Sequence, residues 1–541
     1  MAERRKAARK QGASAQSASS ESASSGSLIQ KATRLHLAGK LAEAIPLYRG
    51  ALESLRTPAL LNNLGAALRD LKRAEEAVPL FREAVAIDPA YADGVLNLGL
   101  SLLDVGDLDG AEAALQRALD LLPGPKGGAP VDPRRLQAIG AYGSVLRTRQ
   151  RFDELIALYL SAVQSAPHDA TLRCQLGSVY FDLSRLTDAV AAFEKAAELD
   201  PKLVAAQGNL GTAYSSLGRA DEAVACQRRA IALEPENPKH YVNLGAALKA
   251  QGLLGEAADA YRQAAALKPD YDYAINNLGN LLREQGRLDE AIACFREAMK
   301  ISPDYLTAYS NLLFTLNSVP DMTAERIYAE HRRFGEIVEA KAPPAAPYPN
   351  RPDPGRRLRI GYLSPDFLGH SVAYFIENLL EHHDRTQVEV VCYAVNKRSD
   401  SLSRRLQARA DLWRSCSFLS DAELAALIRS DKIDILVELA GHTAENRLAM
   451  MAHRPAPVQV SYLGYPNTTG LKAIDYRLTD ALVDPPGECD RLHAEELVRL
   501  RRSFLCFRPS DFAGDVPARP SLATGYVTFE NDAIWESNGH L

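Results

Sequence analysis

Two histidines occupy positions in this 541-residue chain where their side chains could do chemistry. His370 lies in "SPDFLGHS", directly after the apolar run "RLRIGYL", and His442 lies in "AGHT", directly after "IDILVEL". Near neutral pH a histidine can take up a proton as a base or donate a hydrogen bond. We predict a catalytic role for His370 and a substrate-binding role for His442. The alternative for each is that it only ties its own loop together.

A glycine- and threonine-rich segment, "LGYPNTTG", follows a third apolar run, "PVQVSY". It supplies six further candidates for substrate binding, and Thr443, beside His442, is another. The six candidates are Gly464, Tyr465, Pro466, Thr468, Thr469 and Gly470. These residues can form one site with the two histidines only if the fold brings the three segments together.

The elements around these segments predict that it does. Beyond residue 356, strand-like runs at 357–363, 388–395, 433–439 and 457–464 alternate with helical stretches at 372–383, 401–411, 421–431 and 445–452. Such alternation is typical of a parallel sheet with crossover helices, a Rossmann-like α/β lobe. Ligands of open parallel sheets bind outside the carboxyl ends of the strands. Both histidines and the glycine- and threonine-rich segment follow strands, so we expect them at one edge.

Other candidates for chemistry are weaker. His382 and His383, in "EHHDR", are adjacent on a predicted helix end and point apart, so we expect them to face solvent and hold no metal. Asp366 could act as a base, but "SPDF" equally suits a turn or a helix N-cap. The chain has no P-loop, HExxH or GxSxG motif, which leaves phosphate, zinc and acyl chemistry of those kinds without support.

Most of the chain before the α/β region repeats with a period of 34 residues. A glycine marks each copy, and one longer interval contains the insertion "GPKGGAPVDP". The marking glycines are Gly65, Gly99, Gly143, Gly177, Gly211, Gly245 and Gly279. Small residues, an aromatic residue and a closing proline recur at fixed offsets, which matches the tetratricopeptide pattern of paired helices. We predict a helical solenoid over residues 28–340, whose usual task is to hold another polypeptide in its groove.

An asparagine recurs two residues before the glycine position. It is present at Asn63, Asn97, Asn209, Asn243, Asn277 and Asn311. An amide both donates and accepts hydrogen bonds, so a ladder of these side chains could grip the backbone of an acceptor polypeptide. The alternative is a repeat residue that caps or solvates its helix.

Composition limits the class of protein. A net charge of −5 gives no reason to expect a nucleic-acid partner, and no apolar run is long enough for a membrane span. The seven scattered cysteines fit a reducing, cytoplasmic setting. We expect a disordered tail at 1–27, a proline-rich linker at 341–356, the α/β lobe at 357–529 and an aberrant tail at 530–541.

Several of these segments resemble a known family. "LRIGYLSPDFLGHSVAYF", "DILVELAGHT", "RPAPVQVSYLGYPNTTG" and "DYRLTD", after asparagine-bearing repeats, are similar to protein O-linked N-acetylglucosaminyltransferases of the bacterial SPINDLY-like form. The resemblance implies the first half of a two-lobed GT-B fold and an inverting glycosyltransferase. It also implies a nucleotide-sugar substrate, typically UDP-N-acetylglucosamine, and transfer to Ser/Thr hydroxyls; the plant SPINDLY branch uses GDP-fucose. No cofactor is implied, and a homo-oligomer is compatible with it.

The resemblance also assigns residues. His370 matches a family histidine that faces the reacting sugar and has been proposed as base, and Gly464–Gly470 match a family loop, with Asn467 where glycine is usual. After "VTF" at 527–529 the likeness ends, and 12 residues stand where the family has a nucleotide-binding lobe of about 150. We therefore expect a frameshift or gene-model break and an impaired transferase; the alternative is a non-catalytic tetratricopeptide scaffold.

Overall fold

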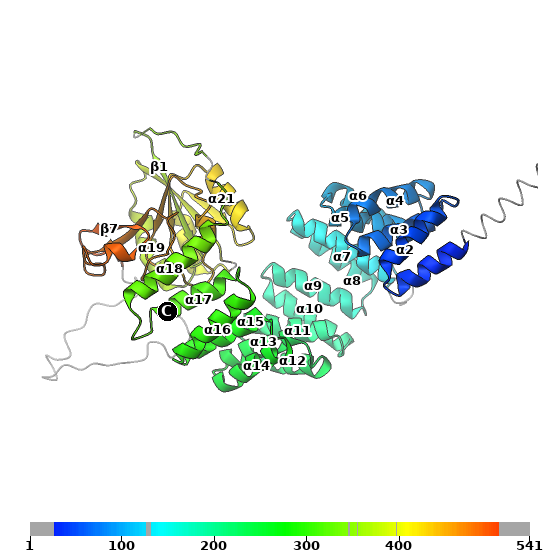
Figure 1. Ribbon diagram of the computed structural model, residues 1–541, viewed down its shortest axis with the longest axis horizontal. Helices are drawn as coiled ribbons and strands as arrows, with labels where there is room; N and C mark the ends of the chain where they lie inside the picture. Colours follow the sequence, from blue (N-terminus) through cyan, green and yellow to red (C-terminus); the bar gives the residue numbers. More distant parts are fainter. Residues whose placement is uncertain (1–25, 126–130, 345–346, 354, 397, 508–541) are drawn as a thin grey trace, which may run out of the picture. The chain divides into compact units, whose positions relative to one another are not determined.

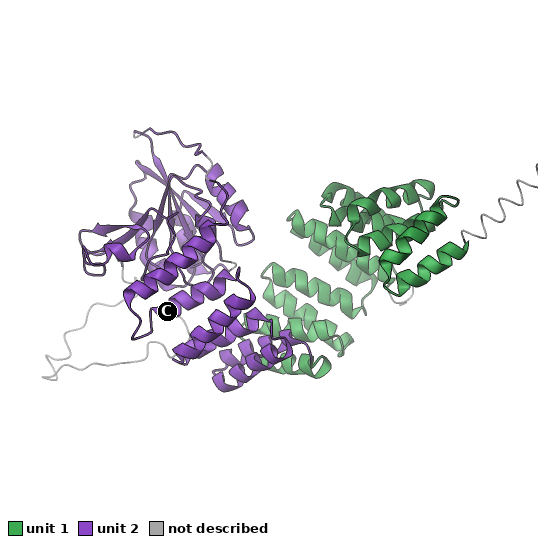
Figure 2. Cartoon of the chain, viewed as in Figure 1, with its two compact units in different colours: residues 1–235 green, residues 236–541 purple. Residues whose placement is uncertain are grey.

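The computed structural model describes residues 26–125, 131–344, 347–353, 355–396 and 398–507 (Figure 1). The expected tails therefore lie outside the described residues, except that residues 26 and 27 begin a helix that runs to residue 37. The "VTF" segment also lies outside them. The chain divides into two compact units, residues 1–235 and 236–541 (Figure 2). The division falls inside the repeat array and not at the proline-rich segment.

The first unit is built of antiparallel helix pairs. Its helices are α2 (Leu41–Leu52), α3 (Pro58–Asp70), α4 (Ala74–Ile87), α5 (Ala92–Asp104), α6 (Leu108–Leu121), α7 (Pro133–Thr148), α8 (Phe152–Ser165), α9 (Ala170–Asp182), α10 (Leu186–Leu199), α11 (Val204–Ser216) and α12 (Ala220–Leu233). The start of α3 shows how the sequence sets a helix N-terminus. Thr57 is the N-cap residue and accepts a hydrogen bond from the Leu60 N–H, and Pro58 occupies the first helical position.

The repeated glycine is the contact point between the two helices of a pair. A Cβ placed on Gly177 of α9 would lie 2.7 Å from the ring of Phe193 on α10, and Gly65 meets Phe81 in the same way. Both rings are fully buried. The glycine therefore admits the aromatic side chain that lies 16 residues later. The periodic pattern is confirmed as a pattern of helix packing.

This packing predicts different results for two glycines of the first unit. Gly177→Ala forces Phe193 out of its position, and we expect a loss of about 1–3 kcal/mol in unfolding free energy. Gly140→Ala, in α7, places its methyl group where no atom lies within 4 Å and gains up to about 1 kcal/mol from helix propensity. Urea denaturation followed by circular dichroism measures both. Equal midpoints for the two variants would contradict the packing argument.

The second unit joins the last repeats to an α/β lobe. Its array helices are α13 (Pro238–Ala250), α14 (Leu254–Leu267), α15 (Asp272–Glu284), α16 (Leu288–Ile301), α17 (Leu306–Leu316) and α18 (Ala324–Glu339). Tyr309 of α17 and Phe334 of α18 pack edge to face, with ring centroids 5.5 Å apart. The same apolar cluster continues into Leu363 and Leu436 of the sheet. The array and the lobe therefore share one core within this unit.

The lobe is a seven-stranded parallel sheet flanked by helices (Figure 1). Its elements are β1 (Leu358–Ser364), α19 (Ser371–His382), β2 (Val388–Ala394), α20 (Ser401–Arg409), β3 (Leu412–Ser415), α21 (Asp421–Ser430), β4 (Ile435–Glu438), α22 (Leu448–Met451), β5 (Val458–Ser461), β6 (Tyr476–Asp480) and β7 (Glu496–Leu500). The strand order is β3-β2-β1-β4-β5-β6-β7. The predicted fold class, a tetratricopeptide array followed by a Rossmann-like lobe, is confirmed.

Some local expectations were incomplete. The structure contains three strands, β3, β6 and β7, that the sequence did not predict. They were missed because their short runs lack the long apolar stretch that marks the four predicted strands. The helix expected at 445–452 shortens to α22, whose first turn is preceded by the residue Glu445 at positive φ. Within the described ranges, every helix is too short or too polar to cross a membrane.

Candidate functional site

Three loops meet at the carboxyl edge of the central strands. β1, β4 and β5 are neighbours in the sheet and run parallel, so the loops that follow them leave from the same edge. These loops carry His370, His442 and the segment Gly464–Gly470. The Tyr465 side chain lies against Gly441, which confirms that the second and third loops are in contact. The edge is therefore the place to look for a site.

His370 is the candidate that remains accessible. It caps the N-terminus of α19, where its Nδ1 accepts a hydrogen bond from the Val372 N–H at 3.3 Å. Its side chain is 44% exposed, and Nδ1 lies 3.7 Å from Oδ1 of Asp366. An accepting Nδ1 carries no proton, so in the neutral ring the proton is on Nε2. In this arrangement His370 can donate a hydrogen bond from Nε2.

Asp366 lies next to His370, and its carboxylate is largely shielded from water. Its N–H donates to the Ser364 Oγ at 2.9 Å, which forms the turn after β1. Its Oδ2 is buried and has no hydrogen-bond partner among the described residues. Burial raises the pKa of Asp366; His370 opposes that shift and Glu445 adds to it. The helix N-cap is His370, so of the two structural roles weighed for Asp366 the structure shows the turn.

His442 is buried and fully engaged. It is 1% exposed, its Nε2 lies 2.9 Å from the Thr469 carbonyl oxygen, and its Nδ1 lies 3.1 Å from the Ser310 hydroxyl. A carbonyl only accepts, so Nε2 carries the proton and Nδ1 accepts from Ser310. Burial lowers the pKa of His442 well below its usual value, with neighbouring His331 acting in the same direction. This placement favours the loop-tying alternative for His442.

One buried carboxylate accepts hydrogen bonds from both threonines of the third loop. Glu495, which is 4% exposed, accepts hydrogen bonds from the Thr468 hydroxyl at 2.5 Å and from the Thr469 N–H at 2.7 Å. The Thr469 hydroxyl donates to the same carboxylate. Both threonine side chains are therefore turned into the protein, and a role in substrate binding stays a prediction for them.

The rest of this loop docks on the helical array. The Tyr465 hydroxyl lies 2.8 Å from Nε2 of His331 in α18 and accepts from the Asn317 amide at 2.7 Å. Asn467, where the family resemblance expects glycine, donates to the Asn317 Oδ1 at 2.9 Å. Asn467 thus ties the loop to the end of α17. Pro466 is the exposed residue of the loop.

The two outer glycines of the loop are required by close chain contacts. A Cβ on Gly464 would collide with the Leu439 carbonyl oxygen, and one on Gly470 with the His331 carbonyl oxygen. Gly470 also has a φ of +79°, which favours glycine. Both glycines therefore shape the loop, and neither is shown to contact a ligand.

The loop after β4 depends on a residue that the sequence arguments missed. Glu438 ends β4, is 3% exposed, and accepts from the Gly441 N–H at 2.8 Å and the Ser461 hydroxyl at 2.5 Å. Burial raises its pKa, against the effect of these hydrogen bonds. A carboxylate directly after the apolar residues 435–437 of β4 was the signal for it. Thr443 is half-buried and donates to the Ala440 carbonyl at 2.9 Å.

The prediction that both histidines of "EHHDR" face solvent is confirmed for His382 and wrong for His383. His383 is half-buried, with its Nε2 2.8 Å from the Tyr362 hydroxyl, while His382 is exposed and lies against the Asn378 carbonyl. The two rings therefore engage different parts of the lobe. In the described part of the chain no cluster of three or more His, Cys, Asp or Glu residues is suited to hold a metal ion.

Some of the repeat asparagines donate hydrogen bonds to side chains of the preceding repeat. Asn97 donates to the Asn62 Oδ1 at 2.8 Å and accepts from Arg69 at 3.3 Å; Asn311 donates to the Asn276 Oδ1 at 2.9 Å. All six are half-buried. The bond forms where the residue 35 positions earlier is polar. Some ladder positions therefore also stabilise the array, which the sequence arguments did not anticipate.

Because some asparagines make these hydrogen bonds and others do not, a role in array stability can be tested separately from a role in peptide binding. Asn97→Ala removes bonds to both Asn62 and Arg69, and we expect a loss of about 1–2 kcal/mol in unfolding free energy. Asn63→Ala is the matched control, because its side chain has no hydrogen bond to any described residue. If the ladder holds a polypeptide, both variants weaken peptide binding but only Asn97→Ala lowers the urea midpoint. Unchanged peptide affinity in both variants would remove the ladder hypothesis.

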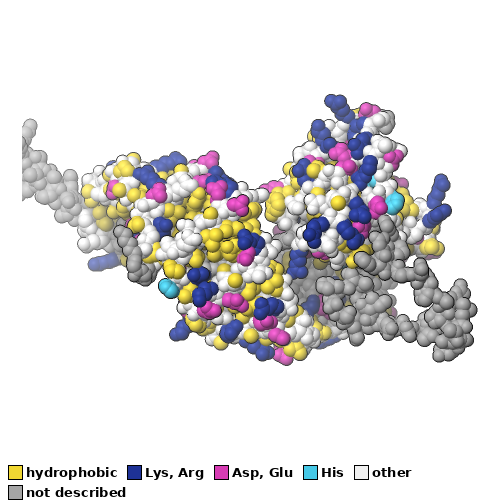
Figure 3. All heavy atoms as spheres, turned by 180° about the vertical axis from the view of Figure 1, so that it is seen from behind, with side chains coloured by type: hydrophobic (Ala, Val, Ile, Leu, Met, Phe, Trp, Pro, Cys, Tyr) yellow, Lys and Arg dark blue, Asp and Glu magenta, His cyan; other side chains and the backbone are white. Residues whose placement is uncertain are grey.

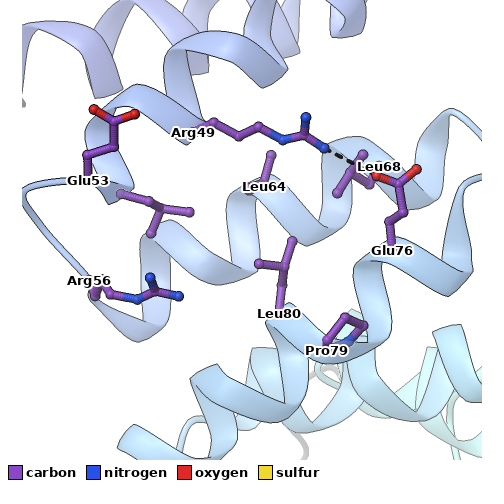
Figure 4. Close-up of a pocket in the computed structure, with 9 residues that line it drawn as sticks. Arg49, Glu53, Arg56, Leu64, Leu68, Glu76, Pro79 and Leu80 are labelled. Carbon is purple, nitrogen blue, oxygen red and sulfur yellow. Dashed lines mark hydrogen bonds and ion pairs between the residues drawn. The ribbon is translucent and has the colours of Figure 1, made fainter.

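A separate pocket lies in the first unit between α2, α3 and α4 (Figure 4). Its volume is about 290 Å³, with a floor that includes Leu64, Leu68 and Leu80. On its rim Arg49 pairs with Glu76 at 3.2 Å. Arg56 binds Glu83 through two contacts of 2.7 Å. Glu53 is the remaining charged residue of the lining, which contains no histidine or cysteine, so the sheet edge with its histidines remains the candidate site.

Known proteins match both the α/β lobe and the repeats of this chain. Residues 331–511 match the family described as "Glycosyl transferase family 41", and tetratricopeptide families match residues 32–92, 68–126, 168–236, 209–272 and 279–312. A Solanum lycopersicum protein named "Probable UDP-N-acetylglucosamine--peptide N-acetylglucosaminyltransferase SPINDLY" is 46% identical over 221 residues. Its Arabidopsis thaliana namesake is 44% identical over the same length.

These matches cover part of each protein. Each plant alignment covers 40% of this chain and 24% of the relative, so the matched region spans about a quarter of the relatives' length. The solved structure of a Thermobaculum terrenum O-GlcNAc transferase mutant is 38% identical, with a TM-score of 0.54, and the match covers 58% of this chain and 61% of that one. The chain is therefore similar to O-GlcNAc transferases over part of its length: it carries tetratricopeptide repeats, and its residues 331–511 match glycosyl transferase family 41.

Proposed function

We propose that this chain is a protein O-glycosyltransferase of the SPINDLY type, which moves N-acetylglucosamine from UDP-N-acetylglucosamine to Ser/Thr hydroxyls of proteins. The observation that carries the proposal is the accessible His370 at the carboxyl edge of the sheet, inside the family 41 region. The names of the two plant relatives support the donor and the peptide acceptor. The repeats support a polypeptide partner, held in the array groove.

The reaction needs a group that handles the acceptor proton. In an inverting transfer the acceptor oxygen bonds to the anomeric carbon, the bond from that carbon to the diphosphate breaks, and the hydroxyl proton leaves. With Nδ1 accepting from the Val372 N–H, His370 is a donor at Nε2. To become a base at Nε2 it must carry its proton on Nδ1. The Asp366 Oδ1, 3.7 Å away, is placed to accept that proton's hydrogen bond after a small ring movement.

A transfer assay tests this function. The purified chain is incubated with radiolabelled UDP-N-acetylglucosamine and a Ser-containing peptide, and label on the peptide is counted. We expect transfer to fall about a hundredfold or more in His370→Ala, in the range of a lost general base. His382→Ala, an exposed histidine on the same helix, is the control and keeps its activity.

Donor binding gives an independent readout. Isothermal titration with UDP-N-acetylglucosamine, UDP and GDP-fucose measures which nucleotide sugar the chain accepts. Absence of both donor binding and transfer would overturn the proposal and leave the repeats as a protein-binding scaffold. We place the reaction in the cytoplasm, which the seven free cysteine thiols support.

A further inference from the structure

An arginine and a phenylalanine form a stacked pair at the end of the array that adjoins the lobe. Arg283 lies on α15 and Phe314 on α17, and the Arg283 Cζ is 5.0 Å from the Phe314 ring centroid. The Phe314 side chain is 36% exposed. The centroid of the Phe314 ring also lies 6.2 Å from that of the Tyr465 ring, in the loop after β5. The pair thus connects the array to the loops at the candidate site.

The pair continues the line of the asparagine contacts. Asn311 and Phe314 are one turn apart on α17, and their contacts on α15 are Asn276 and Arg283, two turns apart. Both contacts therefore run along the same two helix faces. A polypeptide that lies along the asparagines of these helices would meet Arg283 and Phe314 before it reaches the sheet edge.

The second feature of the pair is the charge of the Arg283 guanidinium. Among the described residues it makes no hydrogen bond and no ion pair, although the side chain is half-buried. The adjacent carboxylate, Glu284, is 2.5 Å from the Lys249 Nζ. Burial lowers the pKa of Arg283, and Glu284 only partly opposes this. A partly desolvated cation without a counter-charge is placed to gain from binding an anion.

Stacking leaves the donors of the guanidinium available. An arginine that lies with its face on an aromatic ring keeps its N–H groups at the edge, where two of them can bind one carboxylate. Basic and acidic side chains are intermixed on the face seen in Figure 3, so that face carries no large patch of one charge. Recognition of an anion here would depend on this one arginine.

We propose that the Arg283–Phe314 pair binds an Asp or Glu side chain of the polypeptide that receives the sugar, and so selects acceptors with an acidic residue near the modified Ser or Thr. The term acceptor rests on the proposed function, but binding of an acidic peptide does not require transfer. The pair acts in positioning and specificity; it takes no part in bond making.

Peptide binding to the full chain tests the proposal. Two fluorescein-labelled peptides have the same Ala-, Gly- and Ser-containing sequence and differ only in two Asp or two Asn residues on each side of the central Ser. Fluorescence anisotropy gives their dissociation constants. We expect the Asp peptide to bind about tenfold more tightly, and this preference to disappear in Arg283→Met, which keeps an unbranched side chain on Phe314.

Arg287→Met is the matched control, because Arg287 is exposed and pairs with Glu290 at 2.6 Å. It should keep the preference for the Asp peptide. Circular dichroism confirms that each variant is folded, and Phe314→Leu, which removes the ring but retains the arginine, should reduce the preference. An Asp preference that survives in Arg283→Met would overturn the proposal. So would tighter binding of a phosphoserine peptide with no preference between Asp and Asn.

The result separates this proposal from the proposed function. If the unmodified chain transfers sugar but shows no preference for the Asp peptide, only the role of Arg283 is contradicted. A retained preference in a chain that neither binds donor nor transfers sugar contradicts only the transferase.

Discussion

Replacing Glu495 with alanine is expected to lower the unfolding free energy by roughly 3–5 kcal/mol, the range for breaking a buried charged network. The carboxylate is buried and accepts from the Thr468 hydroxyl and from both the N–H and the hydroxyl of Thr469. Removing it leaves three buried donors without an acceptor. The loop after β5 then loses its support on the lobe side. Urea denaturation followed by circular dichroism measures the loss.

The next residue in the chain supplies the control. Glu496 is exposed, and its backbone N–H donates a hydrogen bond to the Asp475 carbonyl in the sheet. We expect Glu496→Ala to stay within about 0.5 kcal/mol of the unmodified chain. Glu495→Gln keeps one acceptor oxygen but turns an amide N–H₂ toward donors, so its stability should lie between the two. Equal losses at positions 495 and 496 would show that the threonines do not depend on the carboxylate.

The repeat array could be predicted from the sequence because its contacts are local and periodic. The glycine at Gly177 and the ring of Phe193 are 16 residues apart, and the same pair of positions recurs in other copies. The central strands were equally clear, because β1, β2, β4 and β5 are buried and apolar. Parallel strands then fixed which loops share an edge. The position of His370 follows from that rule alone.

The interior of the site could not be predicted, because its partners are distant in the chain. His442 is held by Ser310, 132 residues earlier, and Tyr465 by Asn317, 148 residues earlier. No periodic pattern in the sequence predicts such contacts between the last repeat and the lobe. The glycine- and threonine-rich segment therefore looked like a ligand loop, whereas much of it is packed against α17, α18 and Glu495. Of the buried residues of the site, only Glu438 could have been noticed locally, because it is a charged residue at the end of an apolar strand.

Acid is expected to destabilise the junction between the array and the lobe. His331 and His442 lie with ring centroids 5.2 Å apart and are both buried. Burial lowers the pKa of His331 to about 4; Glu495 opposes this and His493 adds to it. Burial also lowers the pKa of His442 well below its usual value. Both rings are neutral acceptors: the Tyr465 hydroxyl donates to the His331 Nε2, and Ser310 donates to the His442 Nδ1.

The direction of the pH effect follows from proton uptake. Between pH 6.5 and about 4 the unfolded chain binds protons at these histidines that the folded chain does not, so stability is complete above pH 6.5 and falls as the pH drops. Each histidine contributes a slope of up to about 1.4 kcal/mol per pH unit. The raised pKa values of Glu438 and Asp366 act in the opposite direction, since a buried carboxyl is favoured by acid. Urea midpoints from pH 7.5 to 4.5 give the net slope.

Variants at single histidines isolate this contribution. In His331→Gln the side chain no longer titrates, so the variant is less stable at pH 7.5 but should lose less stability between pH 7.5 and 4.5 than the unmodified chain. His168→Gln, at an exposed histidine of the first unit, should leave the slope unchanged. An unaltered slope in His331→Gln would mean that carboxyl groups alone govern the acid response. A smaller slope would place the acid-sensitive step at the buried histidines that join α18 to the loop after β5.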